Sequence, residues 1–423
     1  MKRVSLLGVI LSMVFITKVS AQELTFNEHI APIIHANCVP CHRPGEVGPF
    51  SLISYEDVAK RSKFIRHVTQ TRYMPPWKAD PEFQHYQNER LLSQQEIDMI
   101  ARWIDSGVSE GKKRHQPEPP DFQQNSQMRA EPDLVLTMQE PFAIPATAIE
   151  EFRFFSLPTQ LEEDVYLKAI EFRPGNRQYV HHSRIMLDTT NLIRGINGLS
   201  ELDPKVQEFY QVPLAEEFLY GWVPGNMPFI YPEGTGKLLR KNSDLIVNIH
   251  YAPSAVEAQD QSTVKLYFTR EPIEKEVKIL TLRENDIINQ PFMIPAGESP
   301  KFYMRTAPLE KSIDVIAVLP HMHTLGKTFR AFAITPEGDL VPFVKIDDWD
   351  FNWQSSYVFE EMLTVPAGSV IYAEATYDNT IDNPENPHYP PEDVTYGWNT
   401  TNEMMNFIIY YVDSGEVSKK AGK

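Results

Sequence analysis

The chain has 423 residues, and its 57 acidic side chains against 40 basic ones give a net charge of −17. Such a surface would repel nucleic acid and anionic lipid, so neither is an expected partner. The length allows two or three domains, each with its own core. Both cysteines lie within one five-residue segment, so none remains for a structural disulfide elsewhere.

The first 21 residues are typical of a secretory signal peptide. Lys2 and Arg3 precede an apolar run at 6–17, and Val19-Ser20-Ala21 offers small side chains for cleavage. The run holds about a dozen residues, against roughly 20 needed to cross a bilayer. We therefore expect residues 1–21 to be removed and the rest to be periplasmic or secreted, without membrane insertion. Loss of three basic residues would bring the net charge to −20.

Cys38-Val39-Pro40-Cys41-His42 is the attachment sequence of c-type haem, with two thioether links and a histidine ligand to iron. A redox disulfide would need a thioredoxin-like βαβ context, and a zinc site would need a second ligand pair nearby. Neither is present. We therefore predict one covalent haem held by Cys38, Cys41 and His42, and electron transfer as part of the function.

Helical segments around this motif predict a small all-α cytochrome c domain at residues 22–109. We expect helices at 26–37 and 54–70. The third begins with a capping box, Ser93 and Glu96, carries an apolar face and ends at Gly107. These helices would enclose the haem in one compact unit.

A sixth iron ligand is expected on the loop between the second and third helices. Met74 lies there beside Pro75-Pro76, which hold the loop extended without backbone hydrogen bonds. A thioether ligand would raise the haem potential. His35 and His67 are the rival ligands. The stretch 38–77 resembles cytochrome c modules fused to other redox domains in bacteria, and this resemblance supports Met74.

After a polar, proline-containing linker at 110–132, the pattern changes to short β-rich stretches separated by turn residues. They include 165–172, 245–251, 264–269, 313–319, 369–376 and 407–412. We predict two all-β antiparallel, jelly-roll-like sandwiches at 133–272 and 273–415. The expected fold is therefore multidomain, with a small helical domain followed by two sandwiches.

Five of the twelve histidines fall in these β-rich stretches, in three groups: His181-His182, His250, and His321-Met322-His323. Alternation along a strand puts His321 and His323 on one face. His181 and His182 would point oppositely, and could share an ion only at a strand end or a bulge. Any one histidine alone is more simply a hydrogen-bonded residue, but three groups together favour a metal. Imidazole suits Zn, Cu, Fe or Ni, and an added thioether favours copper.

The sequence resembles the copper type II monooxygenases, which include peptidylglycine α-hydroxylating and dopamine β-monooxygenases. His181-His182, Gly234-Thr235-Gly236 and Ile249-His250-Tyr251 resemble the segments of that family's first copper site. The segment 321–327, His-Met-His-Thr-Leu-Gly-Lys, resembles the second, and 402–407 resembles the segment that supplies a methionine ligand. The resemblance spans roughly residues 133–413.

The resemblance implies two coppers. His181, His182 and His250 would bind the electron-transfer copper, whereas a second set would bind the catalytic, O2-activating copper: His321, His323 and Met404. Strand periodicity does not separate Met404 from Met405, and the family's Glu-Met order selects Met404. Met322 is interpreted as a packing residue.

The implied function is a copper-dependent monooxygenase that hydroxylates a C–H bond of a small organic or peptide substrate with O2. An external donor, an ascorbate-like reductant or a redox protein, would supply electrons, and the fused haem would relay them to the first copper. Two alternatives remain: a non-catalytic haem and copper electron carrier, and a copper-binding or sensing module.

Two departures from the family accompany this interpretation. The β-rich part has no cysteine, whereas animal members have several disulfides. Asn248 stands two residues before His250, where relatives have Gln. Arg184 and Arg240 are equal candidates for a clamp on a substrate carboxylate, and the sequence favours neither.

Overall fold

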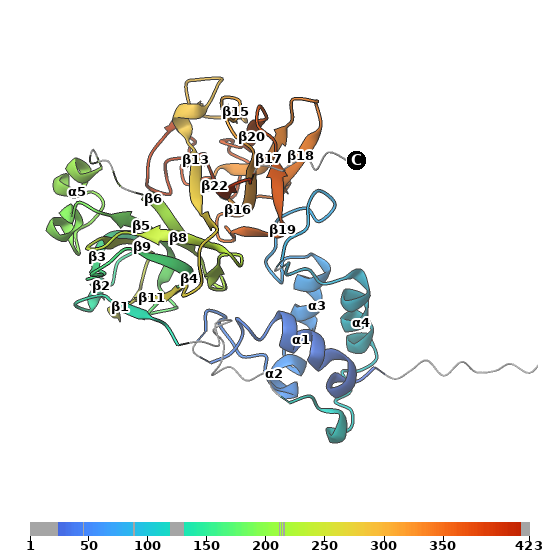
Figure 1. Cartoon of the computed structure of the whole chain (residues 1–423). Helices are drawn as coiled ribbons and strands as arrows, with labels where there is room; N and C mark the ends of the chain where they lie inside the picture. The colour runs from blue at the N-terminus through green and yellow to red at the C-terminus, as the bar shows by residue number, and fades with distance from the viewer. Residues whose placement is uncertain are drawn as a thin grey trace, which may run out of the picture.

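The structure is a computed structural model that describes residues 24–44, 46–87, 89–118, 131–210, 212, 214 and 216–415. The predicted signal peptide and most of the predicted linker lie outside these residues. The described chain is mostly β-structure. It forms a helical unit followed by two sandwiches, coloured blue to teal, green to yellow and orange to red in Figure 1. Within the described residues, no helix has both the length and the apolar character of a membrane span.

The helical unit follows the predicted order, with one difference. Its helices are η1 (Phe26–Ile30), α1 (Ala31–Asn37), α2 (Tyr55–Ala59), α3 (Ser62–Gln70), α4 (Gln94–Asp105) and η2 (Lys113–His115). Capping boxes form at Ser54 and Ser93. The single helix expected at 54–70 is broken between α2 and α3. Val58 and Ile65 are both buried and lie seven residues apart. The apolar period therefore continues across the break, and the sequence does not reveal where the helix is interrupted.

The first sandwich packs two sheets around an apolar core. One sheet has the order β1-β11-β4-β8-β12, with β7 beside β4, and the other has the order β3-β9-β5-β6. The strands are β1 (Leu134–Thr137), β3 (Glu151–Pro158), β4 (Val165–Arg173), β5 (Val180–Asp188), β6 (Glu216–Trp222), β7 (Phe229–Ile230), β8 (Thr235–Leu239), β9 (Asp244–Tyr251), β11 (Thr263–Phe268) and β12 (Lys275–Glu276), and the short pair β2 (Phe142–Ile144) and β10 (Ala258–Asp260) lies outside these sheets.

Between β5 and β6 the chain forms a helical insert that the sequence did not predict. It contains η4 (Leu192–Ile196) and α5 (Pro204–Phe209). Its apolar side chains pack on the outer face of the sheet β3-β9-β5-β6, against Phe154, Met186 and Ile246. Both faces of this sheet are therefore covered, one by the sandwich core and one partly by the insert.

The second sandwich has sheets of order β13-β22-β16-β19 and β15-β20-β17-β18, with a small pair β14-β21. Its elements are β13 (Lys278–Leu282), η5 (Glu284–Asp286), β14 (Met293–Ile294), β15 (Lys301–Arg305), β16 (Ile313–His321), β17 (Gly326–Ile334), β18 (Leu340–Ile346), β19 (Tyr357–Val365), β20 (Val370–Tyr377), β21 (Val394–Thr395) and β22 (Asn406–Asp413). Because β12 still pairs with β8, the chain passes between the sandwiches at residues 276–278.

The two sandwiches share an apolar interface. Side chains of β16 and β22, including Ile316, Leu319 and Tyr410, belong to the same buried cluster as the core of the first sandwich. The ring of Tyr410 lies 4.7 Å from that of Phe229. Apolar burial of this kind limits the relative motion of the two domains.

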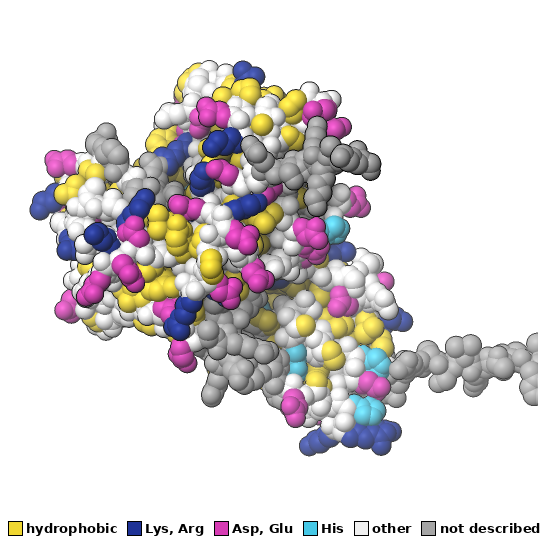
Figure 2. Space-filling view, viewed as in Figure 1, with side chains coloured by type: hydrophobic (Ala, Val, Ile, Leu, Met, Phe, Trp, Pro, Cys, Tyr) yellow, Lys and Arg dark blue, Asp and Glu magenta, His cyan; other side chains and the backbone are white. Residues whose placement is uncertain are grey.

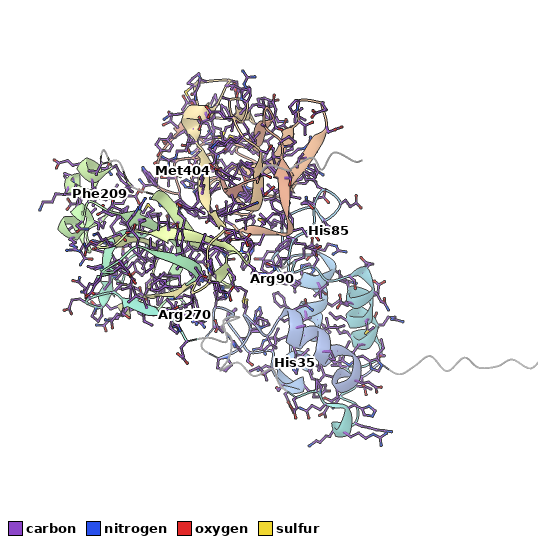
Figure 3. All side chains as sticks on the ribbon, in the orientation of Figure 1. His35, His85, Arg90, Phe209, Arg270 and Met404 are labelled. Atoms are coloured by element: carbon purple, nitrogen blue, oxygen red, sulfur yellow. The ribbon has the colours of Figure 1, made fainter. Side chains whose placement is uncertain are left out.

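The helical unit reaches the second sandwich through residues 77–92, which we call the arm. Trp77, Ala79 and Tyr86 of the arm are buried in the core of the second sandwich. The Tyr86 hydroxyl donates to the Phe343 carbonyl at 2.7 Å, and the Gln87 N–H donates to the Val358 carbonyl at 2.8 Å. Arg90, near the end of the arm, lies where the helical unit meets the β-rich part (Figure 3).

Acidic and basic side chains are interspersed over the face shown in Figure 2, without a continuous basic patch. The histidines visible on this face lie on the helical unit and the arm. The strand-borne histidines are instead found inside the β-rich part.

Candidate metal centre

The first histidine cluster is assembled within the sheet β3-β9-β5-β6. His182 of β5 stands opposite His250 of β9, and the register shifts between Val180 and His182. This β-bulge brings His181 to the same side as its neighbour, which a regular strand would not do. The three Nδ1 atoms lie 3.2 Å (His181 to His182) and 3.3 Å (His250 to each of the others) apart.

Hydrogen bonding does not account well for this triangle of nitrogens. Each Nδ1 is either a donor with one hydrogen or an acceptor, so the three close pairs cannot all be hydrogen bonds. Three nitrogens so close together can, however, all lie at the usual metal–nitrogen distance of about 2.0–2.1 Å from one ion. Among the described His, Cys, Asp and Glu residues, His181, His182 and His250 form the one group of three or more that meets this spacing.

The outer nitrogens of this cluster contact polar side chains. His181 Nε2 is 3.2 Å from Asn352 Oδ1, and His250 Nε2 is 3.4 Å from Glu150 Oε1. The ring of His250 stacks on Phe152 at 4.1 Å. These contacts orient the rings with Nδ1 inward, as outer partners do for metal-binding histidines.

The second cluster lies at the seam between the sandwiches. His321 ends β16, and His323 follows in the turn before β17, with ring centroids 5.2 Å apart. Here Nδ1 is the anchored nitrogen: it is 2.5 Å from Gln354 Oε1 in His321 and 3.0 Å from the Asn402 carbonyl in His323. Both Nε2 atoms are therefore left for a ligand.

The two adjacent methionines, Met404 and Met405, lie in different surroundings. Met405 is fully buried in the core of the second sandwich, whereas Met404 lines the same cavity as His321 and His323. Met322 is fully buried in that core, in agreement with the packing role predicted for it. Two imidazoles and a thioether form a donor set that suits copper, especially Cu(I).

Glu403 joins the segment of Met404 to the turn of His323. Its carboxylate accepts the backbone N–H groups of His323 at 2.9 Å, Leu325 at 2.7 Å and Met404 at 3.1 Å. Burial raises the pKa of this carboxyl group to about 8. In the sequence, Glu403 stood out only as part of the 402–407 segment. Its role in positioning His323 and Met404 became apparent from the structure.

One loop, residues 347–356 between β18 and β19, contacts both clusters, and the sequence did not identify it. Phe351 lies 5.5 Å from His181 and 5.7 Å from His323, measured between ring centroids. Asn352 contacts His181, and Gln354 contacts His321. We call this segment the bridging loop.

Burial keeps most of these imidazoles neutral. It lowers the pKa of His181 and of His321 to about 4 and that of His323 to about 3, and it lowers that of His182 well below 6.5. Neutral imidazole is the form that binds a metal ion. The clusters are thus ready to bind metal at neutral pH.

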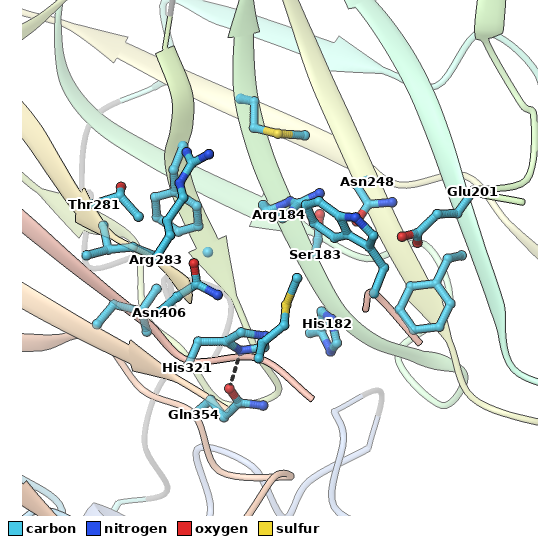
Figure 4. A pocket seen from close by; sticks show the side chains of 18 of the residues that line it. His182, Ser183, Arg184, Glu201, Asn248, Thr281, Arg283, His321, Gln354 and Asn406 are labelled. Carbon is cyan, nitrogen blue, oxygen red and sulfur yellow. Dashed lines mark hydrogen bonds between the residues drawn. The ribbon is translucent and has the colours of Figure 1, made fainter. Parts of the chain in front are cut away.

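A cavity of about 460 Å3 lies beside both clusters (Figure 4). His182 of the first cluster and His321, His323 and Met404 of the second line it, together with aromatic residues of the insert and the seam. Of the two arginines considered from the sequence, Arg184 lines this cavity, whereas Arg240 is exposed and pairs with Asp164. A volume of this size is typical of small-molecule sites.

The residues of the haem motif have a geometry that fits the cofactor. His42 Nδ1 is 3.2 Å from the Phe50 carbonyl, which leaves Nε2 for iron, and its ring stacks on Phe50. Cys38 and Cys41 are on one turn, in which the Cys38 carbonyl accepts the N–H groups of Cys41 and His42. Burial raises the pKa of the Cys38 thiol to about 12. Met74 is half-buried on the expected loop, and its role as a ligand stays a prediction.

Residues 301–421 match the family model described as "Copper type II ascorbate-dependent monooxygenase, C-terminal domain". The human protein "DBH-like monooxygenase protein 1" is 23% identical over 281 residues, and its chicken counterpart is 23% identical over 285 residues. Each match covers 61% of this chain and 44% of the relative, so the chain spans less than half the length of these relatives.

Among solved structures, the major capsid protein P2 from bacteriophage PM2 aligns with a TM-score of 0.24 and 8% identity, over 64% of this chain and 99% of that chain. A similarity this low carries no argument about fold or function. The family model and the two relatives support the copper type II monooxygenase family for the β-rich part of the chain.

Proposed function

We propose that this protein is a copper-dependent monooxygenase that hydroxylates a C–H bond of a small organic substrate with O2. The observation that carries the proposal is that two different donor sets, three imidazoles and two imidazoles with a thioether, border one cavity. A carrier or a copper-sensing module would need the donors but not the cavity.

The two donor sets suit different tasks. Copper would supply electron transfer in one site and O2 activation in the other. His181, His182 and His250 present three fixed nitrogens from one sheet, an arrangement that needs little rearrangement and fits electron transfer. His321, His323 and Met404 line the cavity, so a substrate there can approach them.

The helical unit is proposed to carry the haem and to act as the internal electron donor. Cys41 lies against the first sandwich: a Cβ on Gly225 would come within 3.1 Å of its Sγ and within 3.0 Å of Arg90 Nη1. Gly225 follows Trp222 and Val223, which line the cavity. Glu46, close to the motif, forms an ion pair with Arg177 of the first sandwich. A haem bound through Cys41 would thus have one edge at the β-rich part.

The arm gives a second connection, which runs from the Met74 loop to the bridging loop. Lys78 Nζ lies 2.8 Å from Asp348 and 3.8 Å from Asp350. Asp350 Oδ1 accepts the N–H of Asn352 at 3.0 Å, and Asn352 contacts His181 at 3.2 Å. Few residues therefore separate the predicted iron ligand from the first cluster. This continuity supports a haem that reduces the first copper.

The first experiment is a metal count followed by an assay. The chain isolated after export should contain one haem iron and two coppers. Reduced protein should consume O2 in step with hydroxylation when candidate amides, phenethylamines and amino acids are supplied. Zinc, or a single copper, would weaken the proposal, and O2 uptake without any hydroxylated product would favour the carrier.

The internal-donor role has its own test. In a Cys38→Ala/Cys41→Ala variant without haem, an external donor should reduce the coppers much more slowly than in the intact chain. Rapid mixing with detection of copper by electron paramagnetic resonance measures this directly. Equally rapid reduction of both coppers without haem would remove the helical unit from the electron path and leave the monooxygenase proposal standing.

A further inference from the structure

One part of the cavity wall is built by residues that neither metal cluster uses. Arg184 comes from β5 and Glu201 from the insert (both labelled in Figure 4). Tyr210 also comes from the insert, and Trp398 comes from the segment between β21 and β22. The sequence gave no reason to group them. They are brought together because the insert and the second sandwich meet over the outer face of the sheet β3-β9-β5-β6.

Three polar atoms of this wall are buried without a hydrogen-bond partner among the described residues. They are Arg184 Nε, Glu201 Oε1 and Tyr210 Oη. Only 3% of the Glu201 side chain is exposed. Buried polar groups in native proteins are nearly always paired. Glu201 and Tyr210 are close enough to influence each other's pKa, and a ligand or water beside Arg184 and Glu201 would complete the pairing in this wall. Another carboxylate in the lining, Glu284, is already engaged by the Met405 N–H and the Asn406 side chain, both at 3.0 Å.

The wall carries both signs of charge. The Arg184 guanidinium lies 4.2 Å above the Trp398 ring, which holds it in place from one side. Burial raises the pKa of Glu201, and the positive charge of Arg184 opposes that rise. Among the described residues, Arg184 Nε and Glu201 Oε1 have no hydrogen bond with each other or with another group. A head group with opposite charges of its own can satisfy both.

The rest of this region is aromatic and apolar. Tyr210 stacks on Trp398 at 4.9 Å, and Phe154 meets Tyr210 edge-on at 5.8 Å. Phe209 and Trp222 also line the cavity. Such walls hold a flat or bulky apolar group. Arg184 lines the same cavity as His321, His323 and Met404, so a ligand held at Arg184 can extend toward the second cluster.

We propose that the substrate is a small α-amino acid with an aromatic or large apolar side chain. Its carboxylate would pair with Arg184 and its ammonium group with Glu201, while its side chain extends toward His321, His323 and Met404. A ligand with only a carboxylate would leave Glu201 orphaned, and one with only an amine would leave Arg184 orphaned. This inference deepens the proposed function and rests on it.

The test compares three probes of similar size: phenylalanine, phenethylamine and 3-phenylpropionate. Binding to the copper-loaded, haem-containing chain is measured by calorimetry without O2, so that no turnover occurs. Phenylalanine should bind at least tenfold more tightly than either single-charge probe. If it binds no more tightly than both, the inference is overturned, and this result needs no variant.

Two substitutions test which side chain binds which charged group of the ligand. Arg184→Gln should remove the advantage of phenylalanine over phenethylamine, and Glu201→Gln its advantage over 3-phenylpropionate. Arg240→Gln, an exposed arginine on the same sandwich, is the matched control and should leave all three affinities unchanged. Unaltered preferences in both cavity variants would also overturn the inference.

The binding test separates this inference from the proposed function. Hydroxylation of another compound by a protein that does not prefer phenylalanine would overturn the amino-acid substrate and keep the monooxygenase. The expected binding pattern without O2-coupled product from the reduced, copper-loaded protein would support the recognition site and count against the monooxygenase.

Discussion

The two histidine clusters use the same side chain in opposite ways. In the first, Nδ1 faces the other histidines and Nε2 of His181 contacts Asn352. In the second, Nδ1 of each imidazole is anchored to an oxygen, so Nε2 remains for a ligand. The first is built from two neighbouring strands, whereas the second needs a strand end, a turn and a distant segment that carries Met404.

This difference bears on function. A cluster held by the register of β5 and β9 has little freedom to change its coordination, which suits electron transfer. A cluster assembled from three separate segments depends on Glu403 and the bridging loop for its geometry. It borders the cavity in which a substrate can bind. The following predictions test whether the clusters are as separate as their construction indicates.

The largest effect is expected from removing one ligand of each cluster. His250→Ala and His321→Ala should each retain one copper per chain instead of two, and hydroxylation should fall at least about 100-fold, since loss of an outer partner alone costs 10–100-fold. Metal analysis and electron paramagnetic resonance should show that each variant keeps the other site. His85→Ala, on an exposed histidine of the arm, is the control. Two coppers in His250→Ala would contradict the assignment.

Glu403→Gln should affect the second cluster alone. Whichever way the amide turns, at least one backbone N–H of the His323 turn or of Met404 loses its acceptor. The free energy of unfolding should fall by about 1–3 kcal/mol, as for other buried groups left unpaired. Urea unfolding measures the loss, with the exposed Glu298→Gln as control. Copper at the first cluster should remain; its loss would mean that the clusters are not independent.

Asn352→Ala and Gln354→Ala remove one outer contact from each cluster through the same bridging loop. Each should weaken copper binding by about 10–100-fold at one site, the first cluster for Asn352 and the second for Gln354. Competition with a copper chelator gives both affinities. If either substitution weakened both sites equally, the bridging loop would act as one rigid support.

The smallest effect concerns pH. In metal-free protein, the pKa values of His181, His321 and His323 lie below the ordinary value of about 6.5, so protonation favours the unfolded chain. The contribution of these three histidines to stability should be complete above about pH 6.5 and decline as pH falls toward 4, whereas the raised pKa of Glu403 acts in the opposite direction. From pH 7 to 6 the loss is under about 1 kcal/mol per histidine. Thermal unfolding checks this, and His321→Gln/His323→Gln should flatten the decline. An unchanged slope would contradict the burial argument.

Local pattern was enough to predict several features of this protein. Periodicity located the six quoted β-rich stretches as β4, β9, β11, β16, β20 and β22, and the capping box at Ser93 formed as expected. The spacing of His321 and His323 also anticipated that they would lie close together. These features depend on neighbours in the sequence, whose spacing follows from the geometry of a strand or a helix.

The tertiary structure decided what local spacing could not. His181 and His182 lie on the same side because of a bulge against β9. Met405 lies in the core and Met404 beside the cavity because only one face of their segment meets the core. The bridging loop, the arm and the wall of Arg184 and Glu201 come from segments far apart in the sequence. Their positions follow from packing between domains, which leaves no periodic signal in the chain.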